Sequence, residues 1–361
     1  MSDLLYWLAL RNVSNLGIQK SRILLEVFLT PQKIFEASPS DLKAIKGIGD
    51  VIVRSLGEKE RLISEAEREL IRLKEREISI ITLLDPFYPE LLKEISDPPL
   101  VLFLKGSFSS QDKNSIAVIG TRTPDYYGRT VASQLCSKII ACNFTIVSGM
   151  ARGIDTIAHR TAIKSGGRTI AVMGCGLDIA YPPENLKLME DISVHGAVIS
   201  EFPLGTEPQS CNFPKRNRII SGLSRGVLVV QAREKSGTIH TVNAALEQGR
   251  EVYAVPGPID KELSRGTNYL IKEGAKLVED IQDIMEELVL STDVPSGEKS
   301  VIPEMAGSEK EIYSFISMEP IHIDEIIRKT SMDTGKVLGI LSILEVHGLI
   351  RRIEGNFFVR F

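Results

Sequence analysis

The sequence of 361 residues has few cysteines and little excess charge of either sign. Its four cysteines form no CxxC pair and are not joined by a cluster of histidines, which argues against a zinc site. A disulfide framework is also unexpected at this density, so we expect reduced thiols in a cytoplasmic protein. Lysine and arginine total 43 against 47 acidic residues, a net charge of −4, so any surface for nucleic acid must be a local patch.

Long apolar runs are lacking as well. No stretch approaches the roughly 18 apolar residues of a transmembrane helix, so we expect no membrane association. The first residues, MSDLLYWLALRN, lack the basic region of a signal peptide. A GxxxxGK[ST] phosphate loop, a nucleophile–base pair and a carboxylate pair are also missing, so we expect neither a bound cofactor nor catalysis. Hydrophobic residues at 43% and charged residues at 25% are ordinary for a globular protein.

Four parts can be distinguished along the chain. Residues 1–78 show apolar residues at helical spacing and predict a small helical domain. Residues 79–290 begin with a proline-containing connector and then alternate apolar runs with helical patterns, which predicts the main domain. Residues 291–308, rich in proline, glycine and serine, predict a linker, and residues 309–361 predict a short terminal domain.

The central part predicts a mostly parallel sheet. Its apolar runs are rich in β-branched residues and show no polar alternation, as expected for strands buried on both faces. Repeated strand–helix units of this kind indicate a Rossmann-like, doubly wound α/β fold, whose ligand crevice lies at the carboxyl ends of the strands. The predicted strands are 115–120, 144–149, 169–174, 197–201, 227–232 and 251–257.

The segments that follow these strands carry small, hydroxyl and basic residues. Glycines let a backbone come close to an anion, helix N-termini offer free N–H groups to phosphate, and arginine adds a planar charged fork. Such loops, converging on one sheet edge, predict a site for phosphate or nucleic acid. The candidate residues are Gly120, Thr121, Arg122, Ser148, Gly149, Arg152, Gly153, Phe213, Lys215, Arg216, Asn217, Arg218, Ser236, Gly237 and Thr238.

Each piece also has a plainer interpretation. A glycine after a strand is often only turn chemistry, and Arg122 or Arg152 alone could be a solvated charge. The run Lys215–Arg218 could open a helix with an exposed basic face, although basic residues oppose the helix dipole at that end. Phe213 could stack on a base or could anchor its own loop. The convergence of the loops, more than any single residue, favours an anionic ligand.

Six segments of the central part together carry a resemblance to the DprA (Smf) family of DNA-processing proteins. They occur in the order found in that family, which makes chance similarity very improbable. The segments are IAVIGTRTPDYYG, IVSGMARGIDTIAH, TIAVMGCGLDIAYPPEN, SEFPLGTEPQSCNFPKRNRIISGLS, VLVVQAREKSGTIHTVNAALEQGREVYAVPGPI and RGTNYLIKEGAKLV.

This resemblance implies a protein that binds single-stranded DNA and helps to load RecA onto it, in support of DNA uptake and natural transformation. It also implies a homodimer formed through the Rossmann-like core, and single-strand-binding protein as a further partner. By analogy Arg122 would contact the DNA backbone, and the segment NFPKRNR would line the pocket. Some relatives have a lysine after a Tyr-Pro pair that here continues as Pro183-Glu184, so this loop lacks that cation.

A weaker resemblance suggests a different function. Nucleotide phosphoribohydrolases of the lysine-decarboxylase-like (LOG) group resemble the region around Ser236–Thr238, where their motif is PGGxGTxxE. Here the double glycine is missing and Thr241 stands in place of the catalytic glutamate. Because a threonine hydroxyl is a poor general base near neutral pH, hydrolysis is kept only as the alternative. A structural dimer with a decayed pocket is a third interpretation.

The flanking parts also resemble known modules. Asp41–Gly49 resembles a helix–hairpin–helix element, with a weaker copy near Asn15–Ile18, and a SAM-like domain without DNA contact is the alternative. Residues 309–361 resemble a winged helix, with a wing at LIRRIEGNFFVRF. Its third helix, near 333–346, holds one lysine against two acids, so we expect protein interaction or regulation there instead of duplex binding. The other two helices are expected near 309–317 and 322–329.

Overall fold

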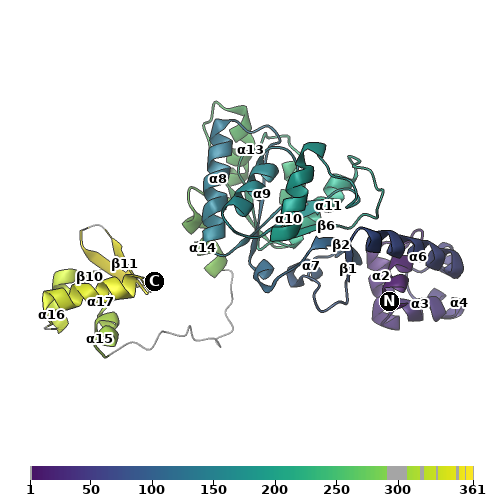
Figure 1. The fold of residues 1–361 in the computed structure, drawn as a ribbon, viewed down its shortest axis with the longest axis horizontal. Coiled ribbons are helices and arrows are strands. Elements are labelled where there is room, and N and C mark those ends of the chain that lie inside the picture. The colour runs from purple at the N-terminus through teal and green to yellow at the C-terminus, as the bar shows by residue number, and fades with distance from the viewer. Residues whose placement is uncertain are drawn as a thin grey trace. The chain divides into compact units, whose positions relative to one another are not determined.

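The computed structural model describes residues 2–290, 307–317, 321–330, 332–346, 349–353 and 355–360. The chain forms two compact units, Met1–Ser291 and Thr292–Phe361 (Figure 1). Most of the linker expected at 291–308 lies outside the described residues. Within the described residues, no helix is long and apolar enough to cross a bilayer, and no group of three or more His, Cys, Asp or Glu side chains could hold a metal ion.

The first unit is built on a nine-stranded sheet with the order β1-β2-β6-β5-β4-β3-β7-β8-β9. The strands from β6 to β9 run parallel, while β2 pairs antiparallel with both β1 and β6. The six predicted strands are confirmed as β3 (Ser115–Ile119), β4 (Thr145–Ser148), β5 (Thr169–Met173), β6 (Gly196–Ser200), β7 (Gly226–Val229) and β8 (Glu251–Ala254).

Three further strands were not predicted. The segment interpreted as a connector contributes β1 (Ser79–Thr82) and β2 (Val101–Gly106), and β9 (Lys276–Leu277) is added at the far edge. Between β1 and β2 the chain contains four prolines and the short helix α7 (Glu90–Lys93), which broke the strand pattern in the sequence. The core sheet therefore begins earlier in the chain than the parallel strands alone indicate.

Helices cover both faces of the sheet, as the doubly wound fold requires. On β3, Ile116 and Val118 pack with one group of helices, and Ala117 and Ile119 belong to the core on the opposite face. The first group is α8 (Tyr126–Ala141), α9 (Ile154–Lys164) and α14 (Ile281–Leu290). The second core includes α11 (Asn212–Gly222) and α12 (Thr238–Glu247). The remaining core helices are α10 (Leu186–His195) and α13 (Glu262–Lys272).

The strand order places the topological switch beside β3. The chain moves from β3 through β4 and β5 to β6 in one direction, then returns to place β7 on the other side of β3. Connections on the two sides of β3 therefore leave toward opposite faces, and a crevice opens where the carboxyl ends of β3 and β7 part. The predicted fold class, a Rossmann-like parallel core, is confirmed.

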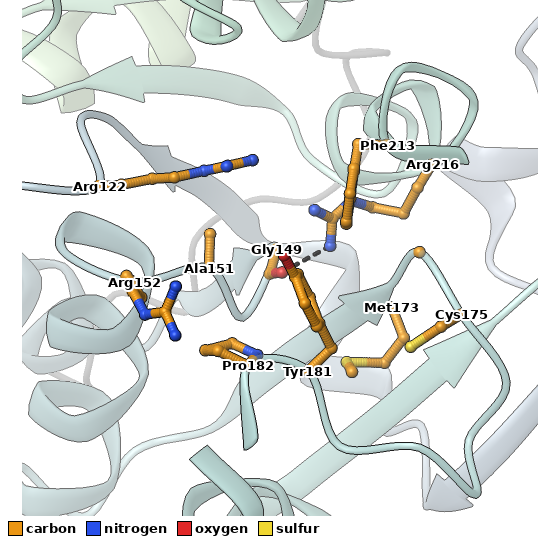
Figure 2. A pocket seen from close by; sticks show the side chains of 11 residues that line it. Arg122, Gly149, Ala151, Arg152, Met173, Cys175, Tyr181, Pro182, Phe213 and Arg216 are labelled. Atoms are coloured by element: carbon orange, nitrogen blue, oxygen red, sulfur yellow. Dashed lines mark hydrogen bonds between the residues drawn. The ribbon is translucent and has the colours of Figure 1, made fainter. Parts of the chain in front are cut away.

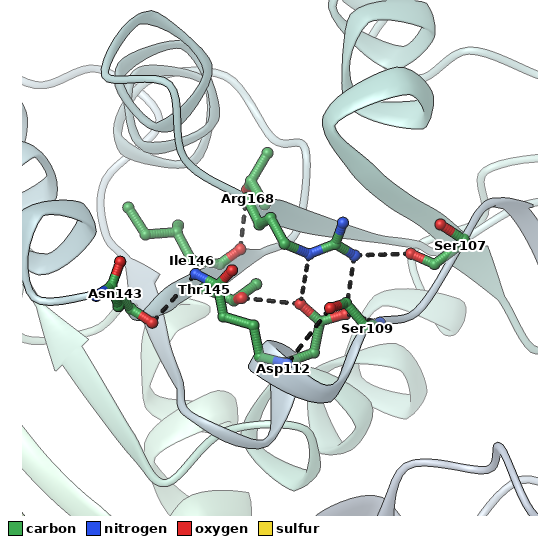
Figure 3. A network of polar contacts seen from close by, with 9 residues as sticks. Ser107, Ser109, Asp112, Asn143, Thr145, Ile146 and Arg168 are labelled. Atoms are coloured by element: carbon green, nitrogen blue, oxygen red, sulfur yellow. Dashed lines mark hydrogen bonds and ion pairs between the residues drawn. The ribbon is translucent and has the colours of Figure 1, made fainter.

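The opposite, amino edge of the sheet is closed by a polar network (Figure 3). Arg168, just before β5, donates to both carboxylate oxygens of Asp112 at 3.0 Å and to the carbonyl of Ser107 at 2.8 Å. The hydroxyl of Thr145, the first residue of β4, donates to Asp112 at 2.8 Å. Asp112 also caps its own 3-10 turn, Ser110–Lys113, which leads into β3. One carboxylate thus links the starts of three neighbouring parallel strands.

The N-terminal helices belong to the same compact unit as the sheet. α4 (Pro39–Lys43) and α5 (Asp50–Gly57) are joined by a tight turn in which Gly47 has φ +91°. The turn between α1 (Ser2–Arg11) and α2 (Ile18–Phe28) repeats this shape, with Asn15 at φ 60°. Both predicted hairpins are therefore present as turns, and DNA contact by them stays a prediction. The remaining helices here are α3 (Pro31–Glu36) and α6 (Lys59–Glu75).

In its described residues, the second unit has three helices and a small antiparallel sheet of order β10-β12-β11. Its helices fall close to the predicted ranges, and the strands β11 and β12 form the expected wing. On α17, Leu338 and Ile343 are exposed, so this helix presents apolar side chains to solvent. A role in protein interaction stays a prediction. The elements are α15 (Gly307–Phe315), β10 (Ile321–His322), α16 (Ile323–Thr330), α17 (Thr334–Val346), β11 (Ile350–Ile353) and β12 (Phe357–Arg360).

Candidate nucleic-acid interface

A cavity of about 740 Å³ opens at the carboxyl ends of β3 and β7, and a narrow cleft adjoins it over β4 and β5. We refer to the two together as the strand-end pocket (Figure 2). The cavity and the cleft share five lining residues, which are Arg122, Ala151, Tyr181, Phe213 and Arg216.

The floor of the strand-end pocket is held by a buried pair of opposite charge. The carboxylate of Asp155, on the first turn of α9, accepts hydrogen bonds from the backbone N–H groups of Gly149 and Ala151 at 3.1 and 3.3 Å. From α11, the guanidinium of Arg216 donates to the carbonyl of Gly149 at 2.6 Å and to that of Val172. Both polar groups of Gly149 are therefore fixed by side chains from two different helices.

Burial perturbs every ionisable group below the floor. It raises the pKa of Asp155 to about 6, although Arg216 and the backbone N–H groups act in the opposite direction. It lowers the pKa of Arg216 to about 10, with Asp155 opposing the shift. Burial and the nearby Arg216 lower the pKa of His159 to about 3, and its Nδ1 lies 2.7 Å from the hydroxyl of Thr169. His159 is thus a neutral core residue that contacts β5.

The loop after β4 needs glycine at its last position. Gly153 has φ +75°, and a Cβ there would lie 2.3 Å from the carbonyl oxygen of Thr121. That carbonyl accepts the N–H of Ile154 at 3.2 Å, while the N–H of Thr121 donates to Gln231 after β7 at 2.7 Å. The three strand-end loops after β3, β4 and β7 are therefore linked by backbone hydrogen bonds. Gly120 and Thr121 line the cavity, and Gly153 lies against the backbone of Thr121 and Arg122.

Phe213 lies between two arginines at the mouth of the pocket. The guanidinium carbons of Arg122 and Arg216 are each 5.8 Å from the centre of its ring. The ring of Tyr181, from the loop after β5, is 5.6 Å away at an interplanar angle of 32°. Figure 2 shows Arg122 extended toward Phe213, with Tyr181 on the far side of the cleft. Two aromatic rings and two cations thus surround one opening.

The two arginines of the upper loops differ in their partners. Arg122 is exposed and, within the described part of the chain, makes only the cation–π contact with Phe213. Arg152 forms a two-pronged ion pair with Glu184, and the two side chains are 58% and 52% exposed. A carboxylate therefore holds one of the candidate phosphate ligands.

The basic run at the start of α11 is divided between two sides of the helix. Arg216 and Asn217 line the cavity, but Lys215 and Arg218 do not. Arg218 forms ion pairs with Asp97 at 3.0 Å and Glu201 at 2.6 Å, away from the pocket. Since successive helical residues are about 100° apart, a run of four cannot point into one cavity. A DNA contact by Lys215 or Arg218 stays a prediction without support from the pocket.

The remaining candidates lie on the side of β7 and β4. Ser236, Gly237 and Thr238 line the cavity at the N-terminus of α12, where the positive end of the helix dipole favours an anion. Ser148 is buried, and its hydroxyl donates to the carbonyl of Val118 at 2.6 Å, so it connects β4 to β3 beneath the pocket. Segments after all five strands from β3 to β7 therefore line the strand-end pocket, and their contact with DNA stays a prediction.

Sequence reasoning missed several residues of the pocket. Tyr181 and Arg233 line it, together with His240 and Thr241 on α12. Arg233 directly follows the predicted strand 227–232, and Tyr181 follows the glycines after the predicted strand 169–174. Both could therefore have been recognised as strand-end residues from the sequence. Asp155 was also not among the candidates, and its buried side chain accepts backbone N–H groups of the loop before α9.

Comparison with known proteins assigns the family. A model described as DNA recombination-mediator protein A matches residues 79–289, which is more than half of the chain. The chain belongs to the DprA family. A second model, the DprA winged helix domain, matches residues 298–356. The resemblance predicted from the sequence is thereby confirmed in both parts.

Curated DprA relatives extend the similarity. The DNA processing protein DprA of Bacillus subtilis is 45% identical over 230 residues, covering 63% of this chain and 77% of its own. Protein Smf of Synechocystis is 32% identical over 391 residues and covers 98% of both chains.

Solved DprA structures share the fold. That of Streptococcus pneumoniae DprA has a TM-score of 0.69 and 36% identity, covering 78% of this chain and 97% of its own. A Helicobacter pylori structure, described for the single-stranded DNA binding mode of DNA processing protein A, has a TM-score of 0.53 and 30% identity. It covers 59% of this chain and 96% of its own.

Proposed function

We propose that this DprA-family protein binds single-stranded DNA in the strand-end pocket, without catalysis. The observation that carries the proposal is the arrangement of Arg122 and Phe213. An exposed guanidinium, without a hydrogen bond or ion pair in the described residues, lies beside an aromatic ring at the opening of a polar cavity. Cations placed with aromatic rings suit a flexible strand, whose phosphates and bases can be engaged at the same time.

Each wall of the pocket takes one part of the strand. Arg122 and Arg233 offer charge to phosphates on the two sides of the switch point, and the N-terminus of α12 adds the positive end of its helix dipole between them. Phe213 and Tyr181 offer rings for an unpaired base, which would contribute about 1–3 kcal/mol per base whatever the sequence. The buried Asp155–Arg216 pair fixes the loop that separates these contacts.

The relative from H. pylori supports the choice of ligand, because its structure concerns single-stranded DNA binding. This chain has the same core fold and belongs to the same family. The side chains that we propose to contact DNA are chosen from the geometry of the strand-end pocket in this chain.

Binding of labelled oligonucleotides, followed by fluorescence anisotropy across a salt series, tests the proposal. Contacts with about three phosphates give a log–log slope near −2 for single strands, and loss of one contact makes it less steep by about 0.7. We expect Arg122→Ala to weaken binding with this change of slope. Arg160→Ala removes the same side chain from an exposed position on α9 outside the pocket, and serves as the matched control. Equal affinity of the two variants would exclude the pocket as the site.

The proposal extends to partners. We propose that the bound strand is passed to RecA, that single-strand-binding protein is displaced in the process, and that the protein acts as a homodimer through its core. The family description as a recombination mediator supports this extension. RecA filament growth on single strands coated with single-strand-binding protein should be accelerated by the wild type and not by Arg122→Ala. Acceleration by both would separate RecA loading from the pocket.

The phosphoribohydrolase alternative has less support in the geometry. The position corresponding to the catalytic glutamate of the LOG group is Thr241, which lines the cavity. The carboxylate on the cavity wall, Asp155, is buried and accepts two backbone hydrogen bonds. Release of free base from nucleoside monophosphates would nevertheless favour this alternative, and the same purified protein serves for that assay.

A further inference from the structure

One face of α6 carries a row of arginines. Arg68 and Arg72 of α6 and Arg76, the residue directly after its end, are four residues apart, so they lie on the same side with a rise of about 6 Å from each to the next. All three residues are exposed. A regular row of exposed guanidinium groups on one helix face offers repeated charge to an extended polyanion.

Few acidic groups neutralise this row. Within the described residues, the side chain of Arg68 donates only to the carbonyl of Ser64, and Arg72 has no ion pair. Arg76 is 3.9 Å from Glu75, a loose and solvated pair. Among the other carboxylates of α6, Glu65 pairs with Arg61 and Glu69 pairs with Arg11, while Glu60 and Glu67 have no ion pair in the described residues. The positive charge of the row is therefore available.

The row also adjoins the strand-end pocket. Gly205, in the loop after β6, has the guanidinium of Arg72 3.7 Å from where a Cβ would lie. The N–H of Gly205 donates to the carboxylate of Asp178 at 2.9 and 3.0 Å, which holds this loop to the one after β5. One end of the loop after β5, at Gly174 and Cys175, lines the strand-end pocket.

The other end of the same loop lines a second cavity. This cavity, of about 250 Å³, is bounded by Asp178, by Arg76 at the end of α6 and by Lys105 of β2. The loop after β5 is thus a wall shared between the strand-end pocket and the arginine row. Asp178 and Glu190 on α10 both oppose an anion in the second cavity, so two carboxylates there balance the two cations, Arg76 and Lys105.

We propose that the α6 arginine row, Arg68, Arg72 and Arg76 with Lys105, is a second contact site for the backbone of the same DNA strand. A strand that leaves the strand-end pocket over the loop after β5 meets Arg72 first and continues along the row. The helical N-terminal region then acts in binding together with the Rossmann-like core. This inference rests on the proposed function, because the row continues a path that begins in the pocket.

The test compares two oligonucleotide lengths in Arg72→Ala/Arg76→Ala. A strand of about 20 nucleotides reaches both sites, and one of about six is within the range that a single small site engages. For the long strand, loss of two phosphate contacts should make the log–log salt slope less steep by about 1.4. Between 50 and 200 mM salt, the ratio of wild-type to variant affinity should then shrink about sevenfold. For the short strand, the affinity should be unchanged.

The control removes equal charge elsewhere. Lys33 and Lys74 are exposed residues of the helical region, and Lys74 lies on a different side of α6 from the row. Lys33→Ala/Lys74→Ala should bind both strands as the wild type does. If it weakens long-strand binding as much as the arginine variant does, the effect is one of net charge and the proposal is wrong.

The remaining outcomes separate this inference from the proposed function. Unchanged long-strand affinity and slope in Arg72→Ala/Arg76→Ala, with Arg122→Ala still defective, would overturn the second site alone. Wild-type binding that is insensitive to Arg122→Ala would overturn the pocket instead. Because the altered side chains are exposed, their removal should leave the melting temperature unchanged, which shows that the variants are folded.

Discussion

Asp155 and Arg216 hold Gly149 from opposite sides: Asp155 accepts its N–H at 3.1 Å, and Arg216 donates to its carbonyl at 2.6 Å. The two side chains come from α9 and α11, which lie on opposite sides of the sheet. Gly149 is the first residue after β4 and lines the cleft of the strand-end pocket. An oppositely charged pair thus sets the conformation of the loop on which the proposed DNA contacts depend.

Removal of Arg216 should lower the free energy of unfolding of the protein. In Arg216→Ala the buried Asp155 loses its counter-charge and two backbone carbonyls lose their donor, so we expect unfolding to become easier by about 3 kcal/mol or more. Urea unfolding at neutral pH measures this change. Arg122→Ala removes an exposed side chain and should stay within about 0.5 kcal/mol of the wild type. An Arg216→Ala protein of wild-type stability that fails to bind DNA would make Arg216 a direct ligand instead.

The shifted pKa values of Asp155 and His159 predict how the stability of the protein depends on pH. Relative to ordinary values of 3.8 and 6.5, burial raises the pKa of Asp155 to about 6 and lowers that of His159 to about 3. Between about pH 4 and 6, folding takes up a proton at Asp155 and releases one at His159, so their effects on the free energy of unfolding cancel.

His159→Gln removes the proton release at His159 and leaves the proton uptake at Asp155. As the pH falls from 6 to 4, the free energy of unfolding of the variant should rise relative to wild type, by up to about 1.4 kcal/mol per pH unit. Urea titrations at several pH values give the two curves. Curves that stay parallel would mean that His159 is not held neutral in the folded protein.

Glu184 should restrain DNA binding. It holds Arg152 in an exposed ion pair at the edge of the cleft and adds a negative charge there. In Glu184→Gln we expect tighter binding of single strands, with a salt slope steeper by about 0.7 because Arg152 becomes free for a phosphate. The fold should be unaffected, since exposed pairs contribute about 0–1 kcal/mol. Anisotropy titrations measure the affinity, and weaker binding would show that Glu184 positions Arg152 productively.

Gly174 gives a way to move the Phe213 ring without removing it. A Cβ at Gly174 would lie 2.9 Å from Cδ1 of Phe213, so Gly174→Ala must displace the ring. We expect weaker single-strand binding together with a destabilisation of about 1 kcal/mol. Gly57→Ala is the control, because its Cβ would meet nothing within 4 Å. Full affinity in Gly174→Ala would show that Phe213 anchors its loop and does not stack on a base.

The sequence predicted the parallel sheet well because its strands are buried on both faces and show no alternation of polar and apolar residues. It predicted the pocket as a place, since strand-end segments converge wherever parallel strands do. It did not predict the roles within the pocket. Arg216 and Arg218 looked alike in the sequence, but one enters the floor and the other pairs with Asp97 and Glu201. The angle between successive helical residues and the tertiary partners of each side chain determine this difference. Neither can be inferred from the run of basic residues alone.

The apparent conflict of these arginines with the helix dipole has the same origin. The unfavourable placement at the start of α11 suggested an anionic ligand for the whole run. In the structure, Asp155 and two carbonyls compensate Arg216, and two carboxylates compensate Arg218. Arg122 has no such partner in the described residues. We therefore assign the phosphate contact to Arg122.

Photo-crosslinking identifies the residues of the protein that lie against a bound base. A single-stranded oligonucleotide with bromodeoxyuridine at one position is irradiated with the full-length protein, and the crosslinked peptide is identified by mass spectrometry. If a base stacks in the strand-end pocket, the crosslink falls on Phe213 or Tyr181, and excess unlabelled single strand removes it while duplex does not. Crosslinks confined to peptides outside the strand-end pocket, such as those of the winged helix, would contradict the account.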